Sequence, residues 1–245
     1  ATGYSGADAF TYTVTDASGA SASATVRLQV VPPITVLGRD SFTRSVTGSW
    51  GTADLGGPWT PTASNLSVDG QRGVISLPAG QNRQGFLGGL TARDVDVSAS
   101  FRLDGVPGGS GAYTSLVARR VASLVEYRGT LRVQANGTVS ALIYRMNAPS
   151  AEAVIGTEMV VPGVTAAPGS SLSVRLRATG ANPTSVRLTV WQTGSPEPAP
   201  QVQATDSTAA LQTAGLTGVT VSLSSKSTVT PVRFSFDDLL VAPSP

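Results

Sequence analysis

The sequence predicts an all-β protein, organised as an antiparallel two-sheet sandwich with a short β-hairpin at its N-terminus. Many segments of roughly six to ten residues alternate apolar and polar side chains, which is the period of a half-buried strand. The 245 residues include 27 Gly and 16 Pro, and both residue types favour turns between strands. Charged residues make up 13%, about half the usual share of roughly 25%. The composition and periodicity both argue against helices.

The first predicted element is a β-hairpin. Residues 10–14 alternate aromatic or aliphatic side chains with threonine, and residues 24–30 alternate again after a turn that begins at Asp16 and ends at Gly19. Asp and Gly at these positions favour a tight turn between two strands. Two strands alone do not make a stable domain. We therefore expect further strands before residue 1, or docking of the hairpin on the rest of the chain.

The segment GADAFTYTVTDASGASASATVRLQV resembles the last strands of the tandem immunoglobulin-like or cadherin-like repeats of large bacterial surface proteins. The resemblance implies a sandwich that lacks its first strands, and such an incomplete sandwich exposes a strand edge. A strand from elsewhere can complete it, and a second copy of the chain is the partner expected at this segment. The paired prolines of Val31-Pro32-Pro33 predict a stiff linker, which divides the chain into residues 1–33 and 34–245.

The second unit is predicted to be a series of strands. Each has one apolar and one polar face, and no helical crossover separates them, which favours an antiparallel two-sheet sandwich. Asn136-Gly137 is a strong hairpin signal between two of them. Residues 205–215 are the one plausible helical turn. The clearest predicted strands span residues 95–103, 113–120, 124–134, 138–146, 171–180, 185–194, 219–225 and 232–242.

This unit opens with RDSFTRSVTGSWGTADLGGPWT and ends with PVRFSFDDLLVAP, with LRATGANPTSVRLTVWQTGSPEPAP between them. Together these stretches resemble the concanavalin-A-like, or laminin-G-like, jelly-roll domains of secreted actinobacterial proteins and of the tail proteins of their phages. The resemblance covers residues 38–243. It implies two curved sheets, with the first and last strands adjacent. It also implies recognition of a carbohydrate or a surface more often than catalysis.

Adjacent first and last strands would bring Asp40 close to Asp237 and Asp238. Jelly rolls of this type often hold a structural calcium between their two ends, and the resemblance places Asp40 and Asp238 at comparable positions, so one calcium is expected there. Calcium takes six to eight oxygen ligands. Strand alternation puts Asp237 and Asp238 on opposite faces, so only one of them can join a given site. The alternative is that these residues cap turns or face solvent.

The aromatic residues allow two interpretations. Trp50 and Trp59 flank a glycine-rich bend, SWGTADLGGPW, and either stack on sugars or fill the core; the bend favours the core. Trp191 lies near the end of a strand and can line the concave sheet. We predict that a ligand contacts one sheet face through Arg119, Tyr127, Arg145 and Trp191. Tyr113 and Tyr144 can line the same face, although tyrosine is common within strands.

The sequence lacks the residues that several kinds of catalysis require. The chain has no Cys and no His, which excludes thiol nucleophiles and imidazole bases. Glycosidases need paired carboxylates, but Glu126 stands alone in its strand and Glu152 and Glu158 fall in a stretch that looks like a loop. Asp94 and Asp96 share a face at a strand start and are expected to be solvated. We therefore expect no enzymatic activity.

Partners follow from charge and hydropathy. The basic residues are scattered, so no patch for nucleic acid is predicted, and no apolar run reaches the roughly 18 residues of a membrane span. The sequence predicts an extracellular or cell-surface, non-catalytic binding or adhesion module whose partner is a glycan or another cell-surface polymer. The alternatives are a receptor-binding domain of a phage tail, located in the virion, and an architectural subunit of a surface filament or layer.

Overall fold

The computed structural model describes residues 4–31, 35–147 and 152–244. The chain forms two compact units, Ala1–Thr35 and Val36–Pro245. The division falls close to the predicted boundary at residue 33. The prolines of the predicted linker, Pro32 and Pro33, lie outside the described residues.

The first unit contains the predicted hairpin. Strands β1 (Gly6–Thr15) and β2 (Ser21–Val30) pair antiparallel, with Phe10 opposite Val26. Alternation gives the hairpin two different faces. On one face hydroxyls pair across the strands, for example Thr11 with Thr25 at 3.0 Å. The other face carries the apolar side chains that alternate with these hydroxyls.

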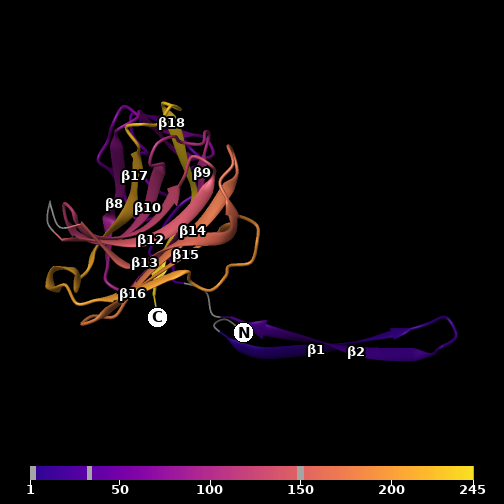
Figure 1. The fold of residues 1–245 in the computed structure, drawn as a ribbon. Helices are drawn as coiled ribbons and strands as arrows, with labels where there is room; N and C mark the ends of the chain where they lie inside the picture. Colours follow the sequence, from indigo (N-terminus) through magenta and orange to yellow (C-terminus); the bar gives the residue numbers. More distant parts are fainter. Residues whose placement is uncertain (1–3, 32–34, 148–151, 245) are drawn as a thin grey trace. The chain divides into compact units, whose positions relative to one another are not determined.

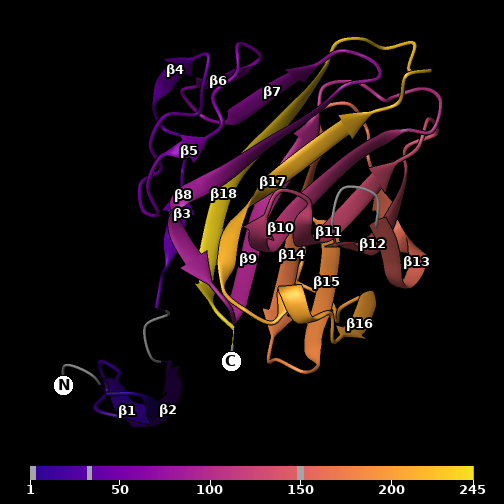
Figure 2. The same ribbon diagram turned by 90° about the vertical axis from the view of Figure 1, so that its left-hand side faces the viewer.

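The second unit is a sandwich of two antiparallel sheets, which confirms the predicted fold class (Figures 1 and 2). Among the described residues, one sheet has seven strands in the order β13-β12-β11-β10-β17-β8-β5. Their bounds are β5 Trp59–Thr60, β8 Asn82–Ala92, β10 Ala112–Ala122, β11 Val125–Val133, β12 Thr138–Asn147, β13 Glu152–Thr165 and β17 Gly215–Leu223.

The other sheet has nine strands within the described ranges. Eight follow the order β16-β15-β14-β9-β18-β7-β6-β4, and β3 also pairs with β18. Their bounds are β3 Gly38–Asp40, β4 Ser45–Thr47, β6 Leu66–Asp69, β7 Gly73–Leu77, β9 Val95–Leu103, β14 Ser171–Thr179, β15 Thr184–Gln192, β16 Val202–Asp206 and β18 Val232–Pro243. The pairing of β3 with β18 places the first and last strands of this unit side by side, as predicted.

The core lies between the two sheets, and both tryptophans of the glycine-rich bend belong to it. Trp50 is 0% and Trp59 is 2% exposed, and their rings meet edge to face with centroids 4.8 Å apart. Phe42 and Phe236 complete the cluster, at 5.3 and 5.6 Å from Trp50. The indole N–H of Trp50 donates to the Val74 carbonyl at 3.0 Å. The interpretation of both tryptophans as core residues is confirmed.

Two segments differ from the expectation. The stretch around Glu152 and Glu158, which looks like a loop in sequence, belongs to the edge strand β13 (Glu152–Thr165), whose register shifts twice against β12. The predicted helical turn is reduced to a short 3-10 helix, η1 (Ala209–Leu211). No helix in the described part of the chain is long and apolar enough to cross a membrane.

Candidate functional site

A groove on the outer face of the seven-stranded sheet is the main candidate site. It has a volume of about 430 Å³. Six strands, β8, β10, β11, β12, β13 and β17, supply its lining. Its polar and aromatic lining residues are Asn82, Arg83, Gln84, Tyr113, Ser115, Arg128, Thr130, Tyr144, Glu152, Thr220 and Ser222.

The register of the sheet arranges these side chains in rows that cross the strands. One row runs through Gln84, Thr220, Ser115 and Thr130. The next runs through Asn82, Ser222, Tyr113 and Arg132. Each row crosses four strands, a span of about 14 Å at the usual strand spacing. The first row forms the floor of the groove, since Thr220, Ser115 and Thr130 are buried and the last two hydroxyls bond each other at 2.8 Å. The second row is more exposed, and a row of hydrogen-bonding groups across four strands suits an elongated polar ligand.

Two tyrosines accompany the rows, Tyr113 within the second row and Tyr144 beside the first. Tyr113 lies under the guanidinium of Arg132, whose central carbon is 5.7 Å from the ring centroid. Tyr144 lies opposite Arg128 across the β11–β12 pair. Burial and the negative charge of Glu152 raise the pKa of the Tyr144 hydroxyl, so this group is protonated at neutral pH and remains a hydrogen-bond donor.

Arg128 is held in place by Glu126, which lies two residues before it on the same face of β11. The Glu126 carboxylate, 0% exposed, accepts from Arg128 at 2.6 Å and from Arg120 at 2.5 Å. The Arg120 guanidinium in turn lies 4.1 Å from the centroid of the Phe86 ring. Two guanidiniums against one carboxylate leave a net positive charge beside the groove. Glu126 is thus engaged in fixing Arg128, while Glu152 lines the groove itself.

The four predicted ligand-binding residues do not share a face, and this corrects the sequence interpretation. Arg119 and Tyr127 are 0% exposed and lie in the interior. Arg145 also points inward, pairing opposite Tyr127 and bonding the Asp206 carboxylate at 3.3 Å. Trp191 faces outward, but from β15 of the other sheet.

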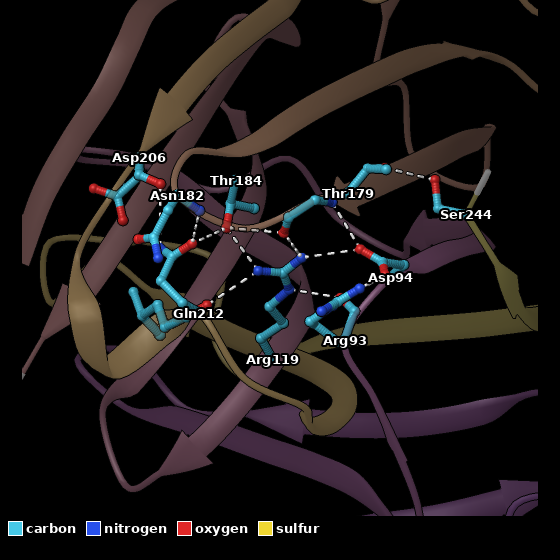
Figure 3. Close-up of polar contacts among 11 residues, drawn as sticks. Arg93, Asp94, Arg119, Thr179, Asn182, Thr184, Asp206, Gln212 and Ser244 are labelled. Carbon is cyan, nitrogen blue, oxygen red and sulfur yellow. Dashed lines mark hydrogen bonds and ion pairs between the residues drawn. The ribbon is translucent and has the colours of Figure 1, made fainter.

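A β-bulge explains the position of Arg119. The register of β10 shifts between Ala118 and Ala122, and Arg119 has a φ of 52°. The extra residue reverses the alternation, so the Arg119 side chain enters the interior. It donates to the carbonyls of Arg93, Gly180 and Leu211 at 2.6, 2.7 and 3.1 Å and to the Thr184 hydroxyl at 2.6 Å (Figure 3). Arg119 therefore joins loops of both sheets.

Tyr127 and Arg145 belong to a second interior cluster. The Tyr127 hydroxyl donates to the Asp206 carboxylate at 2.7 Å, and burial raises the pKa of this hydroxyl. Burial would also raise the pKa of Asp206, but hydrogen bonds from Tyr127, Thr208 and Arg145 outweigh it and hold that pKa below its usual value. These contacts tie β16 to the seven-stranded sheet.

The predicted metal ligands do not fit a calcium site. Asp40 lies opposite Leu239 in the β3–β18 pair, so it is close to Asp238 in the sheet. However, its carboxylate is buried and accepts bonds from Arg44, Trp59 and the backbone of Phe42 at 2.7–2.9 Å. Over residues 4–31, 35–147 and 152–244, no group of three or more Asp, Glu, His or Cys side chains is arranged to hold a metal ion.

The sequence pointed to only part of the groove. Tyr113 and Tyr144 stand out as mid-strand aromatics, but their shared face with Gln84, Thr130 and Thr220 depends on pairings between strands distant in sequence. The signal available in β11 was its alternation: Glu126, Arg128 and Thr130 have the opposite parity to Tyr127. The prediction that Tyr127 faces outward therefore assigned the wrong side chains of β11 to the outer face of the sheet.

Comparisons with known proteins agree with the fold. A family model described as a bacterial Ig domain matches residues 1–29. No curated protein matches the chain. Among solved structures, the catalytic domain of an endo-1,3-beta-glucanase (laminarinase) from Thermotoga petrophila has a TM-score of 0.56 at 11% identity, covering 87% of this chain and 99% of that one. A beta-1,3-glucanase from Mycobacterium marinum has a TM-score of 0.53 at 13% identity, covering 84% and 98%.

A xylan beta-1,4-xylosidase from Bacillus halodurans is also similar, with a TM-score of 0.57 at 9% identity. The match covers 94% of this chain but 46% of the xylosidase, so the chain spans about half of that enzyme. These neighbours overturn the expectation that the chain is not an enzyme, because the same sandwich serves as a glucanase catalytic domain. At 9–13% identity these neighbours show the fold of the second unit.

Proposed function

We propose that the second unit binds a polysaccharide chain in the groove of the seven-stranded sheet. The observation that carries the proposal is the pair of polar rows crossing four strands, with Tyr113 in the second row and Tyr144 beside the first. A sugar presents hydroxyls along its edges and apolar C–H groups on its faces. Side chains with hydrogen-bonding groups suit the edges, and aromatic rings suit the faces.

The glycan-related neighbours support the same ligand class and suggest the first probes. Laminarin and xylan correspond to the substrates in the names of the neighbouring enzymes. Mannan and polygalacturonate extend the set to another neutral polymer and an acidic one. The basic groups near the groove, Arg83 and Arg128, make the acidic polymer a useful comparison.

Affinity electrophoresis in gels that contain each polymer tests the proposal. We expect at least one polymer to retard the protein, and we expect the double variant Tyr113→Ala/Tyr144→Ala to be retarded less by that polymer. Tyr4→Ala is the matched control, because Tyr4 is an exposed tyrosine of the first unit and lies outside its two strands. Migration unchanged by every polymer, or unchanged by the double variant, contradicts the proposal.

Hydrolysis is measured on the same polymers, through the release of reducing ends. Glu152 is the carboxylate that lines the groove among its described residues, so Glu152→Gln is the variant to compare. Loss of reducing-end release in this variant with retained binding identifies a hydrolase. Binding without any release in the wild-type protein identifies a binding module.

We further propose an extracellular or cell-surface location. The match of residues 1–29 to a bacterial Ig domain supports this location. The proposed ligands support it as well, because these polysaccharides lie outside the cell. Fractionation of the source cells, with antibody detection of this chain, tests the location. Recovery in the cytoplasmic fraction contradicts it.

A further inference from the structure

Trp191 and Asp238, two residues that the sequence singles out for different roles, line the same hollow. It lies on the outer face of the nine-stranded sheet and has a volume of about 200 Å³. Ser98, Ser100, Ser173 and Glu197 also line it. The proposed polysaccharide groove belongs to the other sheet, so this hollow is a separate feature.

Strand register makes the hollow a continuous row. Trp191 on β15 lies opposite Ser173 on β14, Ser173 lies opposite Ser100 on β9, and Ser100 lies opposite Asp237 on β18. The row therefore runs from a half-buried indole ring, across small hydroxyl side chains, to the acidic pair of β18. Serine side chains leave space above the sheet between the two ends of the row.

Asp238 is held out of the regular strand. The β18–β9 register shifts between Asp237 and Leu240, and Asp238 has a φ of 51°. This bulge turns Asp238 outward, although strict alternation would place it on the buried face with Phe236. Its carboxylate accepts no hydrogen bond and forms no ion pair within the described residues. Left-handed backbone at a non-glycine residue often marks a functional site.

The charges at the β14 and β15 end of the hollow are already paired. Arg175 bonds Asp96 at 2.6 and 2.7 Å and Glu197 at 2.6 Å, and Arg177 bonds Asp96 at 2.9 Å. These two cations and two anions balance. Asp237 and Asp238 form no ion pair within the described residues and leave a net negative charge at this end of the hollow, which disfavours an acidic ligand. The Asp237 carboxylate accepts the backbone N–H of Asp238, whereas the Asp238 carboxylate is an acceptor for hydroxyl donors.

We propose that this hollow is a second carbohydrate site, which binds a short run of uncharged pyranose units. The row from Trp191 to the acidic pair crosses four strands, about 14 Å at the usual strand spacing, so one sugar ring packs on Trp191 while the hydroxyls of a neighbouring ring donate to the Asp238 carboxylate. Ser98 and Ser173 contact the edge of the sugar chain, and the volume of about 200 Å³, below the roughly 300 Å³ or more of sites for drug-sized ligands, fits a shallow contact with few rings. The site is independent of the proposed groove, and together the two let one molecule contact glycans on both faces.

Tryptophan fluorescence isolates this site. Trp50 and Trp59 are buried, so an emission change on adding a sugar reports Trp191. The probes are laminarihexaose, xylohexaose and cellohexaose, with trigalacturonate as the acidic comparison. We expect a saturable change with at least one neutral probe, which persists in Tyr113→Ala/Tyr144→Ala, and a weaker response to trigalacturonate.

Two variants test the residues. Asp238→Gly removes the carboxylate and suits the positive φ, and Trp191→Phe keeps an aromatic ring. We expect Asp238→Gly to weaken binding of the neutral probe by about tenfold or more, measured by calorimetry, and Trp191→Phe to weaken it less than Trp191→Ala. Near-ultraviolet circular dichroism checks that each variant keeps the packed core.

The proposal is overturned if no neutral probe changes the emission, or if Asp238→Gly binds as tightly as the wild-type protein. It is also overturned if all binding disappears in Tyr113→Ala/Tyr144→Ala, because the groove then accounts for the ligand. If a sugar changes the Trp191 emission but no polymer binds in the groove, this site is supported and the proposed groove is rejected.

Discussion

The guanidinium of Arg44 forms a two-pronged ion pair with the buried carboxylate of Asp40, through two N–O distances of 2.7 Å. The indole N–H of Trp59 and the backbone N–H of Phe42 donate to the same carboxylate at 2.7 and 2.9 Å. A calcium ion at the junction of β3 and β18 would need these oxygens. Arg44 therefore supplies the positive charge where the resemblance implies calcium.

The first prediction is that this junction is stable without calcium. We expect millimolar calcium or EDTA to leave the melting temperature unchanged. We expect Arg44→Met to lower it, because loss of one partner of a buried pair costs about 3 kcal/mol, or roughly 6–12 °C for a domain of this size. Arg39→Met is the control, since Arg39 is an exposed neighbour. A clear rise in melting temperature with calcium would contradict the assignment of this charge to Arg44.

The second prediction concerns acid. Hydrogen bonds from Tyr127, Thr208 and Arg145 hold the Asp206 pKa below its usual value despite burial. A carboxyl with a lowered pKa in the folded state stabilises the fold above its unfolded pKa, and this stabilisation is lost as pH falls through the folded pKa.

We therefore expect Asp206→Asn to be less stable than the wild-type protein at neutral pH, with the difference shrinking below about pH 4, the ordinary range of an Asp carboxyl. Urea unfolding of both proteins between pH 7 and pH 3 measures this. The difference between them removes contributions of other acidic groups, including Asp94. A constant difference across this range would show that Asp206 acts without its charge.

The third prediction separates structure from binding at Arg119. Its guanidinium bonds three carbonyls and the Thr184 hydroxyl in the interior. Arg119→Met leaves these acceptors without donors, so we expect a loss of about 3 kcal/mol or more in the free energy of unfolding. At a temperature where the variant is folded, polysaccharide retardation should equal that of the wild-type protein. If a fully folded Arg119→Met variant is no longer retarded, Arg119 takes part in ligand binding and this prediction is wrong.

Local alternation was sufficient to place many strands. The predicted range 95–103 coincides with β9, and the ranges 138–146 and 171–180 differ from β12 and β14 by one residue at their C-terminal ends. Adjacent first and last strands followed from the family resemblance, not from periodicity.

Alternation failed where a residue was inserted. At Arg119 and Asp238, bulges with positive φ reverse the side-chain direction. Neither Arg nor Asp within a strand pattern predicts this conformation. The groove could not be read from one strand, because its rows join β8, β17, β10 and β11 across the sheet. β13 was missed since Gly156, Pro162 and Gly163 interrupt its pattern.

The fourth prediction is that the first unit associates. Phe10, Tyr12 and Leu28 are 54%, 49% and 48% exposed, and they lie on the face opposite the hydroxyl pairs of β1 and β2. An isolated hairpin is marginally stable, and packing of its apolar face against other strands stabilises it. A second copy of the same hairpin can cover that face.

Sedimentation equilibrium over a wide range of concentrations tests this association. We expect the weight-average mass to rise with concentration, and we expect Phe10→Ser/Tyr12→Ser to remain monomeric at the same concentrations. Thr11→Ser/Thr13→Ser, on the hydroxyl face, is the control and should associate as the wild-type protein does. A wild-type protein that stays monomeric throughout would mean that the apolar face does not pair with its own copy. An apolar face of this kind would then require strands of another segment as its partner.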